Sequence, residues 1–242
     1  AMPEKASLRD SSKYFASSSA GSRSQKLAPV SMTKLSPVMV RFSILPPGVC
    51  IGPYELGALA AGGVLEPLVF KKPRVGIIPS GTEIVPLTEA REEDLCAGRC
   101  LPEFNSYIFS AIVQEAGGEA FTLPIVPDDP EAISAAIDAA IDQGADLVLL
   151  NAGSSAGSHD YSADVIAHKG ELLTHGVAVM PGKPTALGMV RGVPIIGSPG
   201  YPVSAIIVLE ELMRPVLGLY TGIVPGGEAR QAGARLGRGI VS

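Results

Sequence analysis

The most informative stretch of the chain is Ala145-Asp-Leu-Val-Leu-Leu-Asn-Ala-Gly-Ser-Ser-Ala-Gly-Ser-His-Asp-Tyr161. Its apolar run, Leu147 to Leu150, has the length expected of a strand that is buried on both faces. Residues 151–157 then have almost only small side chains, which let the backbone approach a ligand closely and leave N–H groups free to point at an anion. Because Asp160 follows near the start of an expected helix, the stretch predicts a phosphate and metal site. A tight turn with Asp160 as the N-cap of the helix explains the same residues and stays an alternative.

The composition indicates a folded chain with a large aliphatic core. The 242 residues are 46% hydrophobic but only 5% aromatic, and none is Trp, so Ala, Val, Ile and Leu must build the core. The net charge of -5 argues against a general nucleic-acid binder, since a polyphosphate backbone requires a basic surface. No apolar run approaches the roughly 20 residues that span a bilayer, so no membrane segment is expected. The three cysteines, Cys50, Cys96 and Cys100, form no CxxC motif, which predicts reduced thiols in a cytoplasmic protein without structural zinc.

Strand and helix patterns alternate from Lys71 onward. Strands are expected at 74–78, 120–126, 147–150, 185–190 and 193–196, the last two joined as a hairpin. Helices are expected after Asn105 as an N-cap, after the acidic cap in Asp128-Asp129-Pro130-Glu131 as far as Gln143, and from Val203 to about Leu217. This alternation predicts an α/β fold, a three-layer α/β/α sandwich with a mostly parallel central sheet.

Four segments are expected along the chain. Residues 1–33 are rich in Ser, Lys, Arg and Ala and are interpreted as a flexible tail without an assigned element. Residues 34–70 are interpreted as a connector or a remnant of a neighbouring domain, with a strand at 38–44 and a short helix at 54–61. Residues 71–222 form the main domain, and residues 223–242 are expected to begin a further domain.

The turns that follow the expected strands carry the Gly, Ser and acidic residues. Ligands of open α/β sheets bind beyond the carboxyl ends of the strands, where such turns gather. The turns here are 79–83, 127–130, 151–160 and 198–204. Their coincidence at one edge predicts a ligand site there.

Six motifs from these turns and their neighbours occur in a fixed order: Ser80-Gly-Thr-Glu83, Glu103-Phe-Asn-Ser106, Val126-Pro-Asp-Asp-Pro130, Asn151-Ala-Gly-Ser-Ser-Ala-Gly-Ser-His-Asp-Tyr161, Pro181-Gly-Lys-Pro184 and Ser198-Pro-Gly-Tyr-Pro-Val-Ser-Ala205. Together they resemble the molybdopterin-binding, MogA-like domain of the MoeA-type molybdopterin molybdenumtransferases. The resemblance covers about residues 71–220, with a weaker match over 34–70. The sequences of two loops, 151–157 and 199–202, are similar to those of a divergent branch of the family. In that branch the domain is often fused to a periplasmic-binding-protein-like module of the LysR-substrate type. The segment 234–238 resembles the opening of the family's C-terminal domain.

The resemblance implies an activity. Adenylylated molybdopterin and molybdate would bind, AMP would be hydrolysed off, and molybdenum would enter the dithiolene with the help of Mg²⁺. Glu83, Asp128 and Asp160 stand where the family has functional acids, and they are candidates both for metal binding and for catalysis. Ordinary alternatives exist for each, because Glu83 can be a solvated turn acid and the two Asp residues can be helix caps.

The same resemblance implies a set of ligand-binding residues in the small-residue loops. Lys183 can neutralise an anion, Ser155 and Ser204 can donate hydroxyl hydrogen bonds to a phosphate, and Tyr201 can cover a pterin ring or simply pack. The full set expected to bind the pterin cofactor is Gly153, Ser154, Ser155, Gly157, Lys183, Pro199, Gly200 and Ser204.

Four positions depart from the family pattern. The acid that usually precedes the family's Glu is Thr82, two family lysines are Gly176 and Met180, and the usual Asn of the second loop is Tyr201. Losing both lysines removes cations that would hold an oxyanion such as molybdate, so that pterin binding is better supported than turnover.

Three functions therefore stay open. The first is a molybdenum-inserting transferase that acts as a homodimer and receives its substrate from a MogA-type adenylyltransferase. The second is a non-catalytic molybdopterin-binding or sensing module of a longer regulatory protein. The third, ranked lower, is the related adenylyltransferase itself.

Overall fold

The computed structural model describes residues 3–5, 43–151 and 161–222. Its centre is a six-stranded sheet with the strand order β6-β3-β7-β10-β9-β8. The strands are β3 (Arg74–Pro79), β6 (Glu119–Thr122), β7 (Leu147–Asn151), β8 (Glu171–His175), β9 (Ala186–Val190) and β10 (Val193–Ser198). Neighbours from β6 to β10 pair in parallel, and β9 and β8 add antiparallel pairs at one edge. The predicted mostly parallel sheet is confirmed.

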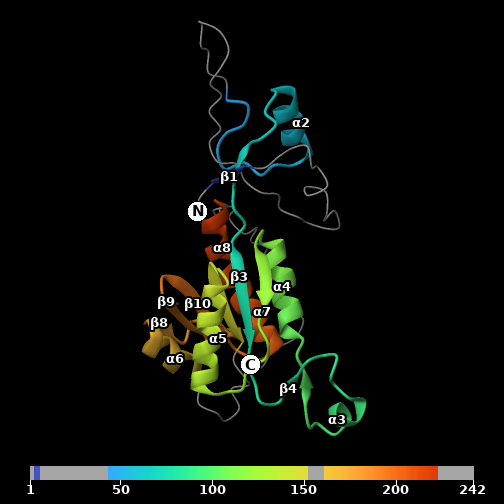
Figure 1. Cartoon of the computed structure of the whole chain (residues 1–242), viewed down its shortest axis with the longest axis vertical. Helices are drawn as coiled ribbons and strands as arrows, with labels where there is room; N and C mark the ends of the chain where they lie inside the picture. The colour runs from blue at the N-terminus through green and yellow to red at the C-terminus, as the bar shows by residue number, and fades with distance from the viewer. Residues whose placement is uncertain (1–2, 6–42, 152–160, 223–242) are drawn as a thin grey trace, which may run out of the picture.

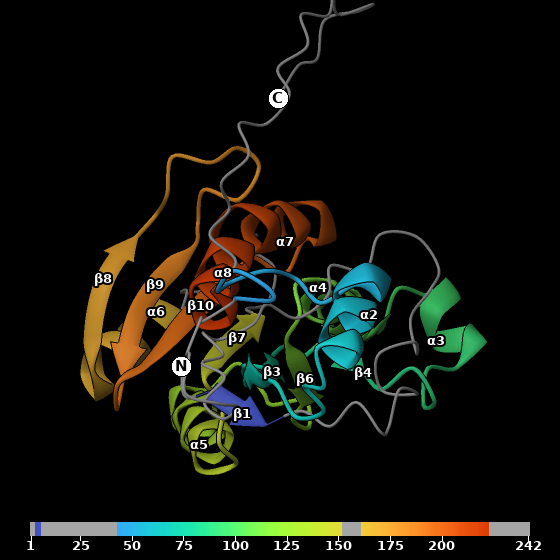
Figure 2. The same ribbon diagram turned by 90° about the horizontal axis from the view of Figure 1, so that it is seen from above.

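Helices cover both faces of the sheet, which completes the predicted three-layer sandwich (Figure 2). On one face, α5 (Pro130–Asp142) and α6 (Tyr161–Lys169) pack into a core with residues of β7 and β10. On the other face lie α4 (Asn105–Glu115), α7 (Pro202–Val208), the π-helical segment η1 (Leu209–Met213) and α8 (Arg214–Thr221). All five residues of β7 are buried because both faces are covered, as its continuous apolar run predicts.

The hairpin and the C-terminal helix are confirmed with one difference. Strands β9 and β10 meet at Arg191 and Gly192, which have φ values of 53° and 80°, the positive values that a tight hairpin turn requires. The helix expected from Val203 to about Leu217 extends from Pro202 to Thr221, but its middle turn is π-helical. Pro215 follows this turn and has no N–H to donate, which disfavours a regular α-helical ladder at that point.

Two predicted helix caps are assigned to different residues in the structure. The N-cap of α5 is Asp129, whose carboxylate accepts a hydrogen bond from the Ala132 N–H at 2.9 Å, and Asp128 is left free of this role. The N-cap of α4 is Phe104, and Asn105 is already the first helical residue. Glu103 supplies the cap interaction instead, because its Oε1 accepts from the Ser106 N–H at 2.9 Å.

The N-terminal part forms a small layer of its own beyond the amino end of β3 (Figure 1). Helix α2 (Pro53–Ala61) confirms the short helix expected there, and it packs through Leu59 near β2 (Leu68–Phe70). Strand β1 (Pro3–Lys5) pairs antiparallel with β2, so the expectation of no element in residues 1–33 is wrong for these three residues. A strand was expected at 38–44. Residues 43 and 44 do not belong to a strand, and residues 38–42 lie outside the described residues.

The segment between β3 and α4 projects away from the sandwich (Figure 1). It contains β4 (Ile84–Val85), α3 (Glu92–Cys96) and β5 (Leu101–Pro102), and β4 and β5 pair in parallel. No helix within the described ranges is long and apolar enough to cross a bilayer.

Candidate functional site

Three parallel strands end side by side at one edge of the sheet. The pairing register places Pro79 of β3 and Ser198 of β10 on either side of Asn151, the last residue of β7. The loop after β3 continues this ladder, since the N–H and the hydroxyl of Ser80 donate to the Asn151 carbonyl at 3.0 and 3.1 Å. The Gly81 N–H donates to the Val126 carbonyl at 3.1 Å. The loops after β3 and β6 are therefore held together at the carboxyl edge, as predicted.

Two of the three candidate acids meet at this edge. Burial raises the pKa of Asp128 above the ordinary Asp value, and the negative charge of Glu83 raises it further. Hydrogen bonds from the Ser80 side chain and the Thr82 backbone act in the opposite direction. Glu83 is also held against the loop, because a Cβ on Gly81, where φ is 156°, would lie 3.3 Å from Glu83 Oε2. Two carboxylates and a hydroxyl thus share one small region.

Asn105 joins three segments at the same edge. Its Nδ2 donates to Asn151 Oδ1 at 3.3 Å and to the Gly200 carbonyl at 2.8 Å. The side chain is buried, and within the described part of the chain its Oδ1 has no hydrogen-bond partner, nor has the hydroxyl of the neighbouring Ser106. Buried polar atoms are almost always paired in folded proteins, so these two atoms mark a place where a further polar group can be accommodated. The sequence analysis names Asn105 as a helix cap and as part of the motif Glu103-Phe-Asn-Ser106, but it misses this link.

The Pro-Gly-Lys-Pro turn lies against the first turns of α7. Gly182 has a φ of 123°, which L side chains rarely adopt, and a Cβ there would also come within 3.0 Å of Val208 Cγ2, so glycine is strongly favoured at this position. The buried Thr185 hydroxyl donates to the Gly182 carbonyl at 2.7 Å and fixes the turn. Lys183 is exposed on this turn, while Ser204 is buried in the first turn of α7.

The remaining candidates divide into two groups. Pro199 is buried and Gly200 partly buried in the loop between β10 and α7, directly after the edge residue Ser198. The other candidates lie outside the described residues: Gly153, Ser154, Ser155, Gly157 and Asp160. Within the described ranges, no group of three or more His, Cys, Asp and Glu side chains is arranged to hold a metal ion. The described part of the candidate metal site is therefore the pair Glu83 and Asp128.

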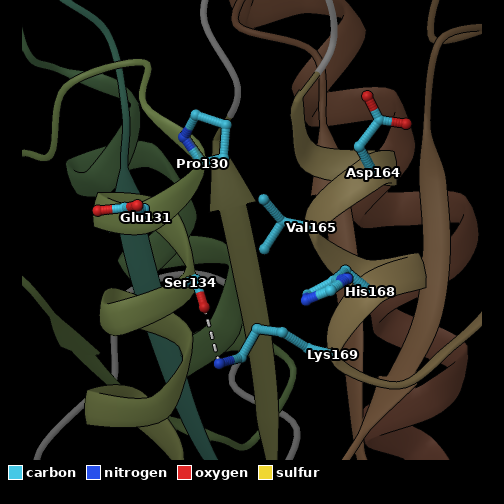
Figure 3. A pocket seen from close by; sticks show the side chains of 7 residues that line it. All are labelled: Pro130, Glu131, Ser134, Asp164, Val165, His168 and Lys169. Carbon is cyan, nitrogen blue, oxygen red and sulfur yellow. Dashed lines mark hydrogen bonds between the residues drawn. The ribbon is translucent and has the colours of Figure 1, made fainter.

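A separate groove of about 460 Å³ lies between α5 and α6 (Figure 3). Val165 and His168 of α6 line it, and Lys169 closes its lower end, where Nζ donates to Ser134 Oγ at 2.8 Å and to Asp138 Oδ2 at 2.6 Å. Because Lys169 is paired in this way, its charge is already matched by Asp138.

Comparison with known proteins identifies the domain. A family model described as "Probable molybdopterin binding domain" matches residues 76–218. The chain belongs to this molybdopterin-binding family. The matched range contains most of β3, all of β7 and β10, and every loop of the candidate site.

Relatives of the family domain carry consistent names. The chain is 30% identical over 189 residues to a molybdopterin molybdenumtransferase of Nostoc sp., covering 76% of this chain and 42% of that protein. It is 32% identical over 191 residues to molybdopterin molybdenumtransferase 2 of Mycobacterium tuberculosis, covering 75% and 45%. A crystal structure of the molybdopterin biosynthesis protein MoeA from Pyrococcus horikosii superposes with a TM-score of 0.64 at 32% identity, covering 72% of this chain and 42% of that one. The chain thus spans less than half the length of each of these relatives.

Proposed function

We propose that this molybdopterin-binding domain takes part in molybdenum cofactor biosynthesis by binding adenylylated molybdopterin, inserting molybdenum from molybdate and releasing AMP. The observation that carries the proposal is the meeting of Glu83 and Asp128 at the carboxyl edge of the sheet, beside Ser80. In open α/β sheets this edge is where ligands bind, and the domain belongs to a family named for molybdopterin binding.

The acid pair suits a divalent cation. The negative charge of Glu83 disfavours ionisation of Asp128, and a bound cation would offset this repulsion; Mg²⁺ prefers oxygen ligands. We propose Glu83, Asp128 and Asp160 as the metal-binding and catalytic acids. Bound Mg²⁺ would neutralise charge on the phosphates, and the Thr82 backbone N–H would keep Asp128 oriented through its hydrogen bond.

The phosphate would be held by loops with free main-chain N–H groups. Lys183 is an exposed cation on a turn packed against α7, and Ser204 stands in the first turn of that helix. With Pro199 and Gly200 they form the described part of the proposed cradle. The proposal extends it to Gly153, Ser154, Ser155 and Gly157.

The reaction consumes one water molecule at the phosphoric anhydride. The water oxygen bonds to phosphorus, the anhydride P–O bond breaks, and AMP leaves while the water protons pass to the two phosphates and to solvent. The two dithiolene thiols bind molybdenum, their protons leave with a molybdate oxygen as water, and the oxidation state of molybdenum is unchanged. One of the three proposed acids would accept a proton from the attacking water.

AMP release tests this function directly. Purified protein is mixed with adenylylated molybdopterin, molybdate and Mg²⁺, and AMP is followed by chromatography. We expect AMP to form and to depend on Mg²⁺, and we expect Asp160→Asn and Asp128→Asn to reduce the rate strongly. An unchanged rate in both variants would remove the assigned acids from the mechanism.

A second candidate is a molybdopterin-binding or sensing module without turnover. It is favoured by Met180, which is 74% exposed, and by Gly176, because both stand where the family has lysines. Tight binding of adenylylated molybdopterin without AMP release would select this module. A homodimer, supply of substrate by a MogA-type adenylyltransferase, and a cytoplasmic location remain part of the proposal.

A further inference from the structure

Exposed aromatic side chains gather near the candidate site. Within the described residues four aromatic side chains are exposed, and three of them, Phe104, Tyr107 and Tyr201, stand at the starts of α4 and α7. Phe104 is 41% exposed, Tyr107 62% and Tyr201 67%. The fourth, Tyr54, lies on α2 beyond the other end of the sheet (Figure 1). In a chain with only 5% aromatic residues, this grouping indicates a use for flat apolar surface at the carboxyl edge.

The chain positions this aromatic group through buried Asn105. Asn105 lies between Phe104 and Ser106 in sequence, and its Nδ2 binds the carbonyl of Gly200, the residue before Tyr201, at 2.8 Å. The same Nδ2 binds Asn151 Oδ1 at the end of β7. The Asn105–Gly200 hydrogen bond therefore connects α4 to the loop before α7. Phe104 and Tyr201 are the sequence neighbours of its two partners.

The chemistry of the surroundings selects the kind of ligand. An exposed tyrosine ring stacks on a flat heteroaromatic ring, and base–aromatic stacking tolerates different bases because every base has a π-face. The buried Asn105 Oδ1, which is an acceptor without a partner among the residues that the structure describes, suits a ligand edge or a bridging water that can donate an N–H or O–H. Pterin and adenine both offer a flat face and N–H donors.

We propose that Tyr201 forms a stacking platform for a flat nitrogen heteroaromatic ring of the substrate, either pterin or adenine, and that Asn105 is the residue that positions this platform through its hydrogen bond to Gly200. The inference rests on the proposed function and adds a specificity-determining residue to it.

Binding measured by calorimetry tests the platform with three probes: AMP, unsubstituted pterin, and ribose 5-phosphate as a ligand that has the phosphate but no ring. We expect Tyr201→Ala to weaken binding of the ring-bearing probe that stacks there by about 5- to 100-fold. Tyr201→Phe keeps the ring and should retain that affinity, and Tyr54→Ala is the matched control with no effect. Ribose 5-phosphate should bind equally to all variants. Which of AMP and pterin responds tells which ring occupies the platform.

Two results would overturn the inference. One is equal affinity of wild type and Tyr201→Ala for both AMP and pterin. The other is a loss of dimer mass in light scattering for Tyr201→Ala with ligand affinity unchanged, which would assign the aromatic group to contact with a second copy of the chain. If wild type binds the ring probes through Tyr201 but releases no AMP from adenylylated molybdopterin, only the proposed transferase activity fails.

A double-mutant cycle tests the positioning role of Asn105. Asn105→Asp keeps the shape of the side chain but loses both N–H donors of Nδ2. If Asn105 acts through Tyr201, Asn105→Asp weakens ring binding in the wild-type background and adds little in the Tyr201→Ala background. An equal loss in both backgrounds would show that Asn105 does not act through Tyr201.

Discussion

Asp128 lies beside Glu83 at the carboxyl edge of the sheet, where burial raises the pKa of the Asp128 carboxyl and the negative charge of Glu83 raises it further. Glu83 follows β3 closely, whereas Asp128 comes after β6 and just before α5, so the fold brings together two acids from neighbouring parallel strands. Two acids that repel each other lower the stability of the folded state. Such pairs are found more often at functional sites, where their charge serves binding or catalysis.

Asp128→Asn should make the protein more stable at pH 7. An acid whose folded pKa is raised binds more protons in the folded state, so stability falls as pH rises from the unfolded pKa through the folded one. Removing the charge should remove this fall, with a gain of at most about 0.5 kcal/mol at neutral pH. Urea unfolding of both proteins from pH 3 to pH 7 measures how the free energy of unfolding depends on pH. A variant that is less stable at pH 7 and equally pH-dependent would contradict the assignment.

Asp129→Ala should cost about 0.5 to 2 kcal/mol of unfolding free energy, because it removes the side chain that caps α5. Asp128→Ala is the matched control one residue earlier, and it should not show this loss. Denaturant midpoints of the two variants decide the matter. A larger loss for Asp128→Ala would mean that the cap lies at Asp128.

Asn105→Ala should destabilise the protein by about 1 to 3 kcal/mol, because the acceptors Asn151 Oδ1 and Gly200 O lose their buried donor. Gln114→Ala, on the exposed side of the same helix, should change stability by less than about 0.5 kcal/mol. Chemical denaturation measures the free energy of unfolding of the two variants and the wild type. Equal and small losses would show that the Asn105 hydrogen bonds contribute little.

Gly188→Ala should destabilise the sheet by about 1 to 3 kcal/mol through overpacking. A Cβ at Gly188 of β9 would lie 2.6 Å from the Glu171 carbonyl of β8 and would also collide with the Ile166 side chain. Gly57→Ala in α2 has nothing within 4 Å of the added Cβ and should gain up to about 1 kcal/mol from helix propensity. Opposite shifts in thermal unfolding are expected, and a loss of stability in Gly57→Ala would contradict the described conformation of α2.

Five of the six strands of the central sheet were predictable because their signals are local, whereas β8 was not among the expected strands. The continuous apolar run of β7 and the Arg191-Gly192 turn each determine one element over a few residues. The N-cap of α5 could also have been predicted correctly. The residue before a proline is biased to the extended conformation that an N-cap needs, and this favours Asp129 over Asp128.

Other features depend on distant residues. Asn105 pairs with residues 46 and 95 positions away, and no local pattern predicts such a link. Strand β1 is stabilised by pairing with β2, about sixty residues later, and β4 and β5 are too short to show a hydrophobic period. Of the three candidate acids, the meeting of Glu83 and Asp128 is described, whereas Asp160 stays a prediction.

Binding of Mn²⁺, a spectroscopic probe for Mg²⁺, tests the acid pair most directly. Electron paramagnetic resonance follows free Mn²⁺ during titration of the protein in the presence of AMP, with Glu119→Gln as an exposed acidic control at the opposite end of the sheet. We predict that wild type and Glu119→Gln bind one Mn²⁺, and that Glu83→Gln and Asp128→Asn each weaken its affinity by about tenfold or more. Unchanged Mn²⁺ affinity in both site variants, or no binding by wild type, would contradict the proposal that these two carboxylates hold the metal.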